Sequence, residues 1–442
     1  NALANNTTAA NNTAVGKDAL LANTTGDKNV SVGAVALDAN TTGASNTAIG
    51  FESLTANVAG SKSVGVGTGS LSDQNPSSAT DMFNTAVGFN AGASVTTGTS
   101  NTTVGGLSLD ANTTGSSNTA LGRSAMTANT TGGDNTAVGR GSMSSNTTGS
   151  TNAALGFNAL ASNTTAANNT AVGSAALASN TTGANNTAVG ALAADAITVG
   201  ANNTAIGEEA LSLDTKGSKS VAIGGNALGN QNFTSATDTL NVAVGFDAGV
   251  ALTTGIKNTI IGGLAADAMT TGSSNTFIGF DSVGAGVTTG NENVAVGIGA
   301  AGPLTSGASN VCVGPDSGSG LTTGSNNLFL GHDAGRTGSP GGNITAGSNA
   351  IVLGDESIGD AHIQVDWTVA SDQRDKTDFT ALDLGLDFVK ALAPVTYKWD
   401  KRSKYGDKSA ADYDLAAQTP DGTHKEDWLD IGFKAQEVEA LE

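Results

Sequence analysis

The stretch NTAVGKDALLANTTGDK, at residues 12–28, decides the fold, because the next stretch, NVSVGAVALDANTTGAS at 29–45, repeats its pattern. Each copy opens with a pentad that ends in a glycine, here Gly16 and Gly33. Such pentad glycines recur twenty times up to Gly354, and fifteen of the nineteen intervals between them are seventeen residues long. A short fixed period predicts a solenoid, whose units bury their apolar residues only by stacking on one another.

Two apolar clusters recur in every repeat. The residue before each pentad glycine is aliphatic, as at Val15, and the residue two positions earlier, Thr13, shares its face because side chains alternate along a strand. An Ala-Leu pair follows the glycine, as at Ala19 and Leu20. We therefore predict two strand-like segments per turn, with these aliphatic residues directed inward.

The remaining repeat positions have the composition of corners. The glycine of each NTTG, at Gly26, Gly43, Gly115 and Gly132 among others, is expected to adopt a positive φ. Asparagine opens seventeen of the twenty pentads. Stacked in successive turns, these amides could form a hydrogen-bonded ladder along the axis; alternatively, asparagine simply suits a corner.

A longer repeat is superimposed on the short one. Residues 60–92 return as residues 217–249, and each copy carries a four-residue insertion, before Asn84 and before Asn241. A block duplication is implied, and the insertions are expected to bulge from one edge of the solenoid.

Charge divides the chain of 442 residues. Residues 1–354 hold 28 charged side chains and residues 355–442 hold 30, as well as every Trp and Tyr. We predict a shaft at 1–354, a connecting strand segment at 355–370 and a separate domain at 371–442. The chain opens in mid-repeat without Met, so we expect it to belong to a longer product.

Composition also excludes several classes of function. A formal net charge of −20 disfavours nucleic acid and anionic membranes as partners, and no apolar run is long enough to insert into a membrane. Cys312 is alone, so no intrachain disulfide or cysteine metal cluster is possible, and we expect a packed thiol.

The pentads NTAVG, NVAVG and SVAIG, each followed by x-x-A-L, resemble the head repeats of trimeric autotransporter adhesins of the YadA type. Similar repeats occur in bacteriophage tail fibres. The resemblance covers about 350 residues, although the period here is longer than is usual in the adhesins. It implies a left-handed parallel β-roll and a trimeric, rod-like surface fibre.

The C-terminal segment resembles a second family. IGDAHIQVDWTVASDQRDKTDF (358–379), LGLDFVKALAPVTYKWD (384–400) and GFKAQEVEALE (432–442) are similar, in this order, to the endosialidase-type intramolecular chaperone of phage tail fibres and spikes. The resemblance implies a small α+β domain that trimerises, guides folding of the stalk and then cuts itself off. That domain normally continues into further helix beyond the AQEVE motif, whereas this chain stops at Glu442.

The resemblance also implies the catalytic residues. The S-D-x-R-x-K motif corresponds to Ser371, Asp372, Arg374 and Lys376, with a scissile bond between Ala370 and Ser371. Ser371 would be the nucleophile and Lys376 its base, because a serine hydroxyl requires a base and a desolvated lysine can serve. Asp372 and Arg374 would pair within or between chains. Without the flanking motifs, the same residues would be interpreted as a charged turn.

Other candidate sites are weaker. No carboxylate spacing accompanies His332, His362 and His424, so neither a metal site nor a cofactor is predicted, although a trimer could place His332 on its axis. Aromatic residues directly follow five pentad glycines and could stack on glycans or pack between protomers. These are Phe51, Phe89, Phe157, Phe246 and Phe280.

The sequence thus predicts an all-β, homotrimeric parallel β-solenoid with a C-terminal self-cleaving chaperone and no metabolic activity. We interpret it as a phage tail-fibre or spike shaft on the virion. Its expected partners are other tail proteins and a host cell-surface glycan or protein receptor. One alternative is the stalk of a bacterial cell-surface adhesin, which the chaperone motifs disfavour. Another is a fibre with polysaccharide depolymerase activity, which would require an acidic cleft.

Overall fold

A computed structural model describes residues 1–361, 388, 391–400, 405, 417–425, 427–434 and 437. The chain separates into two units, Asn1–Glu356 and Ser357–Glu442, and each is described by itself. Among the described residues, no helix is long and apolar enough to cross a membrane.

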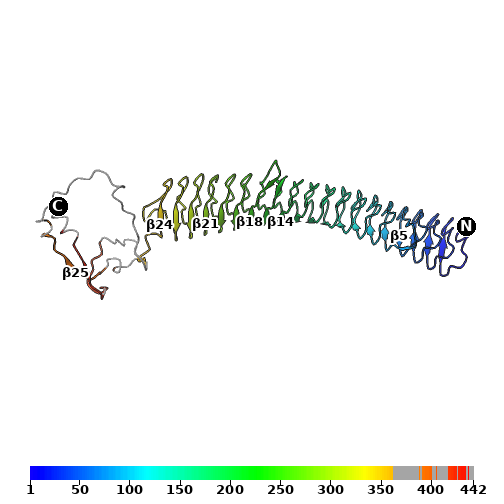
Figure 1. Ribbon diagram of the computed structural model, residues 1–442, viewed down its shortest axis with the longest axis horizontal. Helices are drawn as coiled ribbons and strands as arrows, with labels where there is room; N and C mark the ends of the chain where they lie inside the picture. Colours follow the sequence, from blue (N-terminus) through cyan, green and yellow to red (C-terminus); the bar gives the residue numbers. More distant parts are fainter. Residues whose placement is uncertain are drawn as a thin grey trace. The chain divides into compact units, whose positions relative to one another are not determined.

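The first unit is a parallel β-solenoid in which each turn contributes one three-residue strand to a single twenty-stranded sheet (Figure 1). β10 (Thr136–Val138) lies between β9 (Thr119–Leu121) and β11 (Ala153–Leu155), and both pairings are parallel. Equivalent residues of successive repeats therefore stack directly on one another. The predicted fold class, a parallel β-solenoid with turns of about seventeen residues, is confirmed.

The remaining strands of this sheet are β1 (Thr13–Val15), β2 (Val30–Val32), β3 (Thr47–Ile49), β5 (Val64–Val66), β7 (Thr85–Val87), β8 (Thr102–Val104), β12 (Thr170–Val172), β13 (Thr187–Val189), β14 (Thr204–Ile206), β16 (Val221–Ile223), β18 (Val242–Val244), β19 (Thr259–Ile261), β20 (Thr276–Ile278), β21 (Val294–Val296), β22 (Val311–Val313), β23 (Leu328–Leu330) and β24 (Ile351–Leu353). Two smaller parallel pairs join β4 (Gly60–Ser61) to β6 (Thr80–Asp81) and β15 (Gly217–Ser218) to β17 (Thr237–Asp238).

The centre residue of each strand, and not its aliphatic neighbours, points into the coil. Ala137 and Ala154 are buried, whereas Val15 is 57% and Leu155 is 51% exposed. The prediction that the aliphatic residues before the pentad glycines face inward is therefore wrong. Most strand centres are small residues, because large residues fill the interior from the opposite wall; Ile260, Phe277 and Phe329 are larger, buried exceptions.

That opposite wall, the Ala-Leu segment, is not a second strand as predicted. Asn158 and Leu160 have φ of 53° and 52°, in the left-handed region that residues other than glycine seldom adopt. Because every second residue here has a positive φ, the segment winds so tightly that both Ala159 and Leu160 are fully buried. Hydrogen bonds still join successive turns here, because the Leu160 amide donates to the Ala176 carbonyl at 3.0 Å.

The large apolar side chain that fills the interior comes from one of two positions in the turn. Eight turns have Leu or Met four residues after the pentad glycine and Asn seven after it, as at Leu160 and Asn163. In six other turns, position four is Ala or Gly and position seven is a buried apolar residue. These pairs are Gly92 with Val95, Ala194 with Ile197, Gly249 with Leu252, Ala266 with Met269, Ala301 with Leu304 and Gly318 with Leu321.

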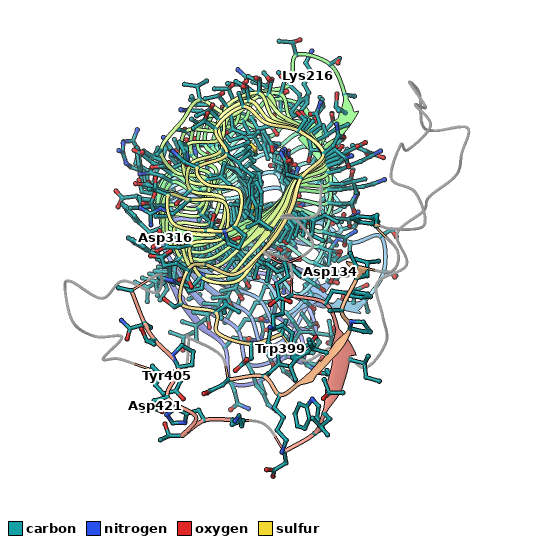
Figure 2. The ribbon with its side chains drawn as sticks, turned by 90° about the vertical axis from the view of Figure 1, so that its left-hand side faces the viewer. Asp134, Lys216, Asp316, Trp399, Tyr405 and Asp421 are labelled. Atoms are coloured by element: carbon teal, nitrogen blue, oxygen red, sulfur yellow. The ribbon has the colours of Figure 1, made fainter. Side chains whose placement is uncertain are left out.

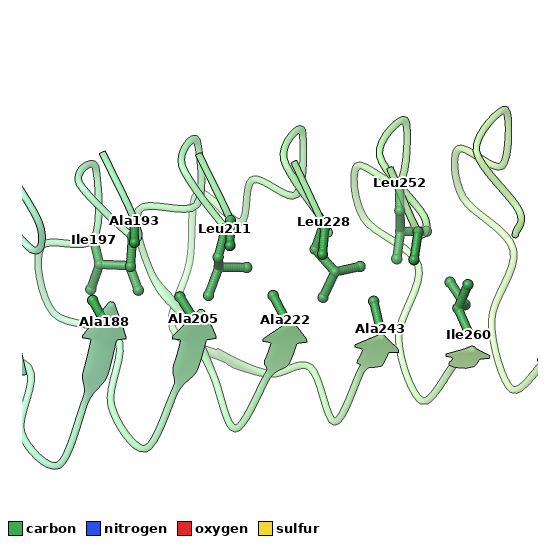
Figure 3. Packing of buried hydrophobic residues seen from close by; sticks show 14 of the residues in the cluster. Ala188, Ala193, Ile197, Ala205, Leu211, Ala222, Leu228, Ala243, Leu252 and Ile260 are labelled. Atoms are coloured by element: carbon green, nitrogen blue, oxygen red, sulfur yellow. The ribbon is translucent and has the colours of Figure 1, made fainter. Parts of the chain in front are cut away.

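Figure 3 shows the result of this exchange. Ile197 and Leu252 lie on the same side of the interior as Leu211 and Leu228, facing the strand centres. A larger strand centre, Ile260, also accompanies the glycine at 249, where a Cβ would lie 2.8 Å from the Ile260 Cδ1 atom. Core volume is thus conserved although the residue types move, as close packing requires.

Positive φ occurs at the pentad glycines rather than at the NTTG glycines. Gly156 has a φ of 147°, and a Cβ there would lie 2.2 Å from the Gly173 carbonyl oxygen of the next turn. Gly26 and Gly43 do not have positive φ, so that prediction is wrong. A Cβ on Gly26 would nevertheless lie 2.2 Å from the Gly43 carbonyl oxygen, so close stacking of turns explains this glycine.

The predicted asparagine ladder is confirmed. Asn135 is buried, and its Nδ2 donates to the Gly149 carbonyl at 2.9 Å while its Oδ1 accepts the Asn152 amide at 3.0 Å. A second ladder, not predicted, runs through the asparagines at position seven, where the Asn40 Nδ2 donates to the Asn23 Oδ1 at 2.8 Å. Most buried amides therefore find partners along the axis, as their desolvation requires, although the Asn180 Oδ1, where the second ladder meets Ile197, has none.

The two insertions bulge from the coil, the second one above the β14 label in Figure 1 and beside Lys216 in Figure 2. Each adds one of the small parallel pairs and an exposed ion pair, Lys62 with Asp81 and Lys219 with Asp238. Inside the first bulge, the Gln74 Oε1 accepts hydrogen bonds from Ser63 and Asn84. A glutamine thus bridges the gap in the ladder where serine replaces the pentad asparagine.

Candidate functional site

The predicted catalytic residues Ser371, Asp372, Arg374 and Lys376 lie outside the described residues, as does the Ala370–Ser371 bond. The predicted connecting segment is described only at 355–361, where it contains no strand. The structure describes other parts of the C-terminal unit, and the roles of the four residues stay predictions.

The structure brings the second and third C-terminal motifs together. β25 (Val395–Tyr397), from LAPVTYKWD, pairs in antiparallel fashion with β26 (Asp430–Gly432), at the start of GFKAQEVE. The Leu392 amide donates to the Phe388 carbonyl at 3.1 Å, the spacing of a helical turn. Motifs more than thirty residues apart in the sequence thus form one local structure.

Asp400 organises the loop that follows β25. Its Oδ1 accepts the Tyr405 hydroxyl at 2.7 Å, and its Oδ2 accepts the Gly422 amide at 2.7 Å. The Tyr405 ring meets the His424 ring edge-on, with centroids 4.9 Å apart. Hydrogen bonds from the Thr423 hydroxyl and amide lower the pKa of Asp421. The arrangement positions a loop and presents no nucleophile with a base.

The described part of the C-terminal unit exposes many large apolar side chains. Ile431 is 79% exposed and Trp428 is 61% exposed. Leu429, Phe433 and Trp399 are also exposed.

The shaft carries a much longer apolar surface, here called the strand face. It consists of the last residue of each strand in the twenty-stranded sheet, flanked by the half-buried Thr or Val that begins most of these strands. Its most exposed members are Val15, Ile49, Val87, Leu121, Leu155, Ile206, Ile261, Val313, Leu330 and Leu353. Turns stack about 4.8 Å apart, so nineteen intervals give this face a length of about 90 Å.

The five aromatic residues that follow pentad glycines are exposed by 43–60%. The Arg140 guanidinium lies over the Phe157 ring, 4.3 Å from its centroid. Glycan stacking and packing between protomers both remain open for these rings.

A pocket of about 320 Å³ opens on the Ala-Leu side of the shaft. Its lining includes the carboxylates of Asp195 and Glu209, with Asn226 and Leu213, around the bare backbone of Gly229. Burial, followed by repulsion from Glu209, raises the pKa of Asp195. The pocket is acidic, and the Ser212 hydroxyl in its lining donates to the Gly229 carbonyl at 3.4 Å.

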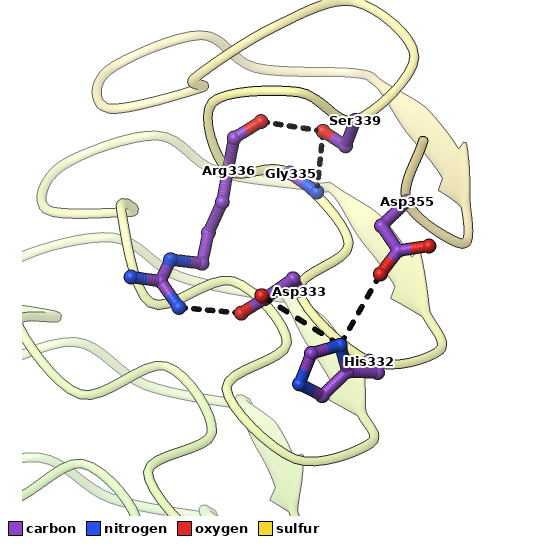
Figure 4. A network of polar contacts seen from close by, with 6 residues as sticks. All are labelled: His332, Asp333, Gly335, Arg336, Ser339 and Asp355. Atoms are coloured by element: carbon purple, nitrogen blue, oxygen red, sulfur yellow. Dashed lines mark hydrogen bonds and ion pairs between the residues drawn. The ribbon is translucent and has the colours of Figure 1, made fainter. Parts of the chain in front are cut away.

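One group of possible metal ligands was not predicted from the sequence. An imidazole nitrogen of His332 and carboxylate oxygens of Asp316 and Asp333 all lie within 4.8 Å of one another. The His332 Nδ1 is 3.2 Å from Asp355 Oδ2, and this contact, with the charge of Asp333, raises the pKa of His332 (Figure 4). Of the other histidines, His424 contacts Tyr405, and His362 lies outside the described residues.

Comparison with known proteins adds one finding. Residues 371–441 match the protein-family model described as chaperone of endosialidase, which agrees with the resemblance of the C-terminal motifs. No curated protein and no solved structure is significantly similar to the chain. The chaperone family implies trimer formation. A β-solenoid shaft followed by a segment that matches the chaperone of endosialidase fits a tail-fibre-like protein.

Proposed function

We propose that this chain is a homotrimeric fibre protein of a phage tail, which holds a host-attachment region away from the virion. Three β-solenoid shafts lie side by side through their strand faces. The C-terminal domain assembles the trimer, aligns the three chains and then releases itself at the Ala370–Ser371 bond. The adhesin-like and tail-fibre-like repeats support the assignment to a surface fibre.

The strand face is the observation that carries this proposal. An apolar strip that continues through twenty strands is far longer than the patches that monomeric proteins leave in water. The repeat leaves the register between neighbouring shafts ambiguous, because a slip of seventeen residues changes few of the contacts between their strand faces. A non-repetitive trimerisation domain at one end supplies the missing register.

The proposed cleavage is an acyl transfer followed by hydrolysis. The Ser371 hydroxyl oxygen attacks the Ala370 carbonyl carbon, and Lys376 accepts the hydroxyl proton. The peptide C–N bond breaks, the Ser371 amine takes a proton and an ester joins Ala370 to the Ser371 oxygen. Water then hydrolyses this ester, which leaves the Ala370 carboxylate and restores the serine hydroxyl.

Intact mass spectrometry of the full chain, with any natural C-terminal continuation included, tests the cleavage. We expect a fragment that begins at Ser371 from the unmodified chain, and an uncut chain from Ser371→Ala and from Lys376→Met. An uncut chain in all three samples, despite correct trimers, would remove the self-cleaving role and favour the cellular adhesin alternative.

Light scattering after size-exclusion chromatography tests the strand face. The double variant Leu121→Asp/Leu155→Asp places charges on it, and we expect the trimer to be lost or weakened while the circular dichroism of the coil remains. The control Val199→Asp/Leu213→Asp alters two equally exposed aliphatic residues outside the strands. Trimers that survive the first variant as well as the control would contradict the proposed packing.

A further inference from the structure

We propose that Asp316, His332 and Asp333 form a binding site for a divalent transition-metal ion at the C-terminal end of the shaft. The site would join the last turns of the solenoid. This inference does not depend on the proposed fibre function, because it rests on side chains of a single chain.

The repeat itself brings these ligands together. Asp316 and Asp333 each stand two residues after a pentad glycine, so they occupy equivalent places in adjacent turns. Both have positive φ, 52° and 53°, which aspartate tolerates better than most residues. His332 directly precedes Asp333, and Asp355 occupies the position of His332 in the next turn. Three successive turns therefore direct polar side chains to one point.

The distances suit coordination of one ion. The His332 Nδ1 lies 3.6 Å from the Asp333 Oδ2. One ligand atom from each of Asp316, His332 and Asp333 lies within 4.8 Å of the other two. Ligand atoms placed about 2.0–2.2 Å from a metal ion are separated by distances of this order. An ion could therefore bind with small rotations of exposed side chains.

Two neighbouring charged side chains, Arg336 and Asp355, contact the proposed ligands. Figure 4 shows that the two oxygens of Asp333 have different neighbours: Oδ1 accepts the Arg336 guanidinium, and Oδ2 faces the imidazole. Asp355, whose side chain is only 14% exposed, contacts the same Nδ1 that faces Asp333. An ion bound at this nitrogen would replace that hydrogen bond and leave the Asp355 carboxylate close enough to act as a further ligand.

The donor set indicates the class of ion. One imidazole nitrogen with two carboxylates suits Zn²⁺, Co²⁺, Ni²⁺ or Mn²⁺, whereas Mg²⁺ and Ca²⁺ prefer oxygen ligands alone. Arg336 competes with the ion for Asp333, so its removal should tighten binding.

Titration of the metal-free full chain with Zn²⁺ in a calorimeter, and with Co²⁺ followed by visible absorption, tests the site. We expect one saturable site per chain that is absent or at least about tenfold weaker in His332→Ala and in Asp316→Asn, and tighter in Arg336→Gln. A hundredfold excess of Mg²⁺ should not displace Co²⁺. Because His332 is 60% exposed, its removal should leave the coil folded, which circular dichroism checks.

The matched control is Asp281→Asn. Asp281 also stands two residues after a pentad glycine, but its neighbour is Phe280 instead of a histidine. We expect this variant to bind Zn²⁺ and Co²⁺ as the unmodified chain does. Equal binding by the unmodified chain and His332→Ala, or no saturable binding by the unmodified chain, would overturn the proposal.

Discussion

Leu155 and Leu160 belong to the same turn of the shaft and have opposite environments. Leu155 ends strand β11 and is 51% exposed, whereas Leu160 lies in the tightly wound segment opposite and is fully buried. Regular strand geometry therefore belongs to the side of the coil that presents its large side chains outward. The irregular side fills the core. The strand side is the surface that we propose for assembly, and the tightly wound segment supplies the core of the single chain.

We expect the largest loss of folding stability at a pentad glycine, which joins the strand side of a turn to the tightly wound side. Gly105 has a φ of 133°, and a Cβ would lie 2.6 Å from the Gly122 carbonyl oxygen. Gly105→Ala should lower the free energy of unfolding by more than about 3 kcal/mol, because it combines backbone strain with a clash against backbone. Thermal and chemical denaturation measure this loss.

The neighbouring Gly106 is the control for that prediction. A Cβ there would come no closer than 3.9 Å to the Phe89 carbonyl oxygen. Gly106→Ala should therefore leave the stability almost unchanged. Similar losses at both positions would show that the backbone conformation of the pentad glycine is not what sets the turn.

The two leucines themselves give the next largest difference. Leu160→Ala should destabilise the coil by about 2–5 kcal/mol, because it removes a buried side chain and leaves a cavity. Leu155→Ala should change the stability of the isolated coil by less than about 1 kcal/mol, since half of its side chain already meets solvent. Urea unfolding under conditions that keep the chain monomeric separates the two. A reversed order would place the core on the strand side.

The asparagine ladder should give a smaller effect. Asn135→Ala leaves the buried Asn152 amide without its acceptor, whereas the Gly149 carbonyl keeps the Asn146 Nδ2 as a donor. The unpaired amide should cost about 1–3 kcal/mol. Thr130→Val is the comparison, because the Thr147 carbonyl that its hydroxyl contacts also accepts backbone amides. We expect a loss below about 1 kcal/mol there. Equal losses would mean that the ladder adds nothing beyond ordinary hydrogen bonding.

The smallest predicted effect is a gain in folding stability that depends on pH. The folded state raises the pKa of Asp195 above its usual value of 3.8, mainly through burial. Folding stability therefore falls as the pH rises from 3.8 to that raised pKa, the loss is complete above the raised pKa, and below pH 3.8 it is absent. Asp195→Asn should stabilise the coil at pH 7 by a few tenths of a kcal/mol, since solvent screens a half-buried charge.

Asp110→Asn is the control for the pH effect. Asp110 has the same place in its turn, but it accepts the Thr127 hydroxyl at 2.6 Å. We expect no gain in stability at pH 7 from this variant. A gain at Asp195 that persists below pH 3.8 would contradict the electrostatic explanation.

The period, the parallel stacking and the first asparagine ladder could be predicted because they follow from identity between neighbouring repeats. The side chain of Asn135 must meet its equivalents when residues seventeen positions apart are stacked. Inward and outward faces could not be predicted in this way. Alternation along β11 allows either Ala154 or Leu155 to face the core, and periodicity does not distinguish the two choices.

The histidine cluster was missed for a related reason. Asp316 and Asp333 do lie at the common period, but periodicity does not show that their side chains converge on His332. His332 and Asp355 are 23 residues apart, so a search at the common period does not connect them. They meet because the six additional residues lie outside the stacked part of the turn. The catalytic assignment of Ser371 and Lys376, by contrast, rests on sequence motifs and the family match alone.

By itself, the sequence determined that the chain is a stack of similar turns, with a different domain at its end, and it suggested one asparagine ladder along the axis. Repetition imposes this outcome, because identical units with unburied apolar faces must stack. Only the tertiary structure decided which apolar residues form the core and which form the strand face. That choice depends on left-handed backbone angles at residues such as Leu160, whose energetic cost is offset only when the whole turn closes around them.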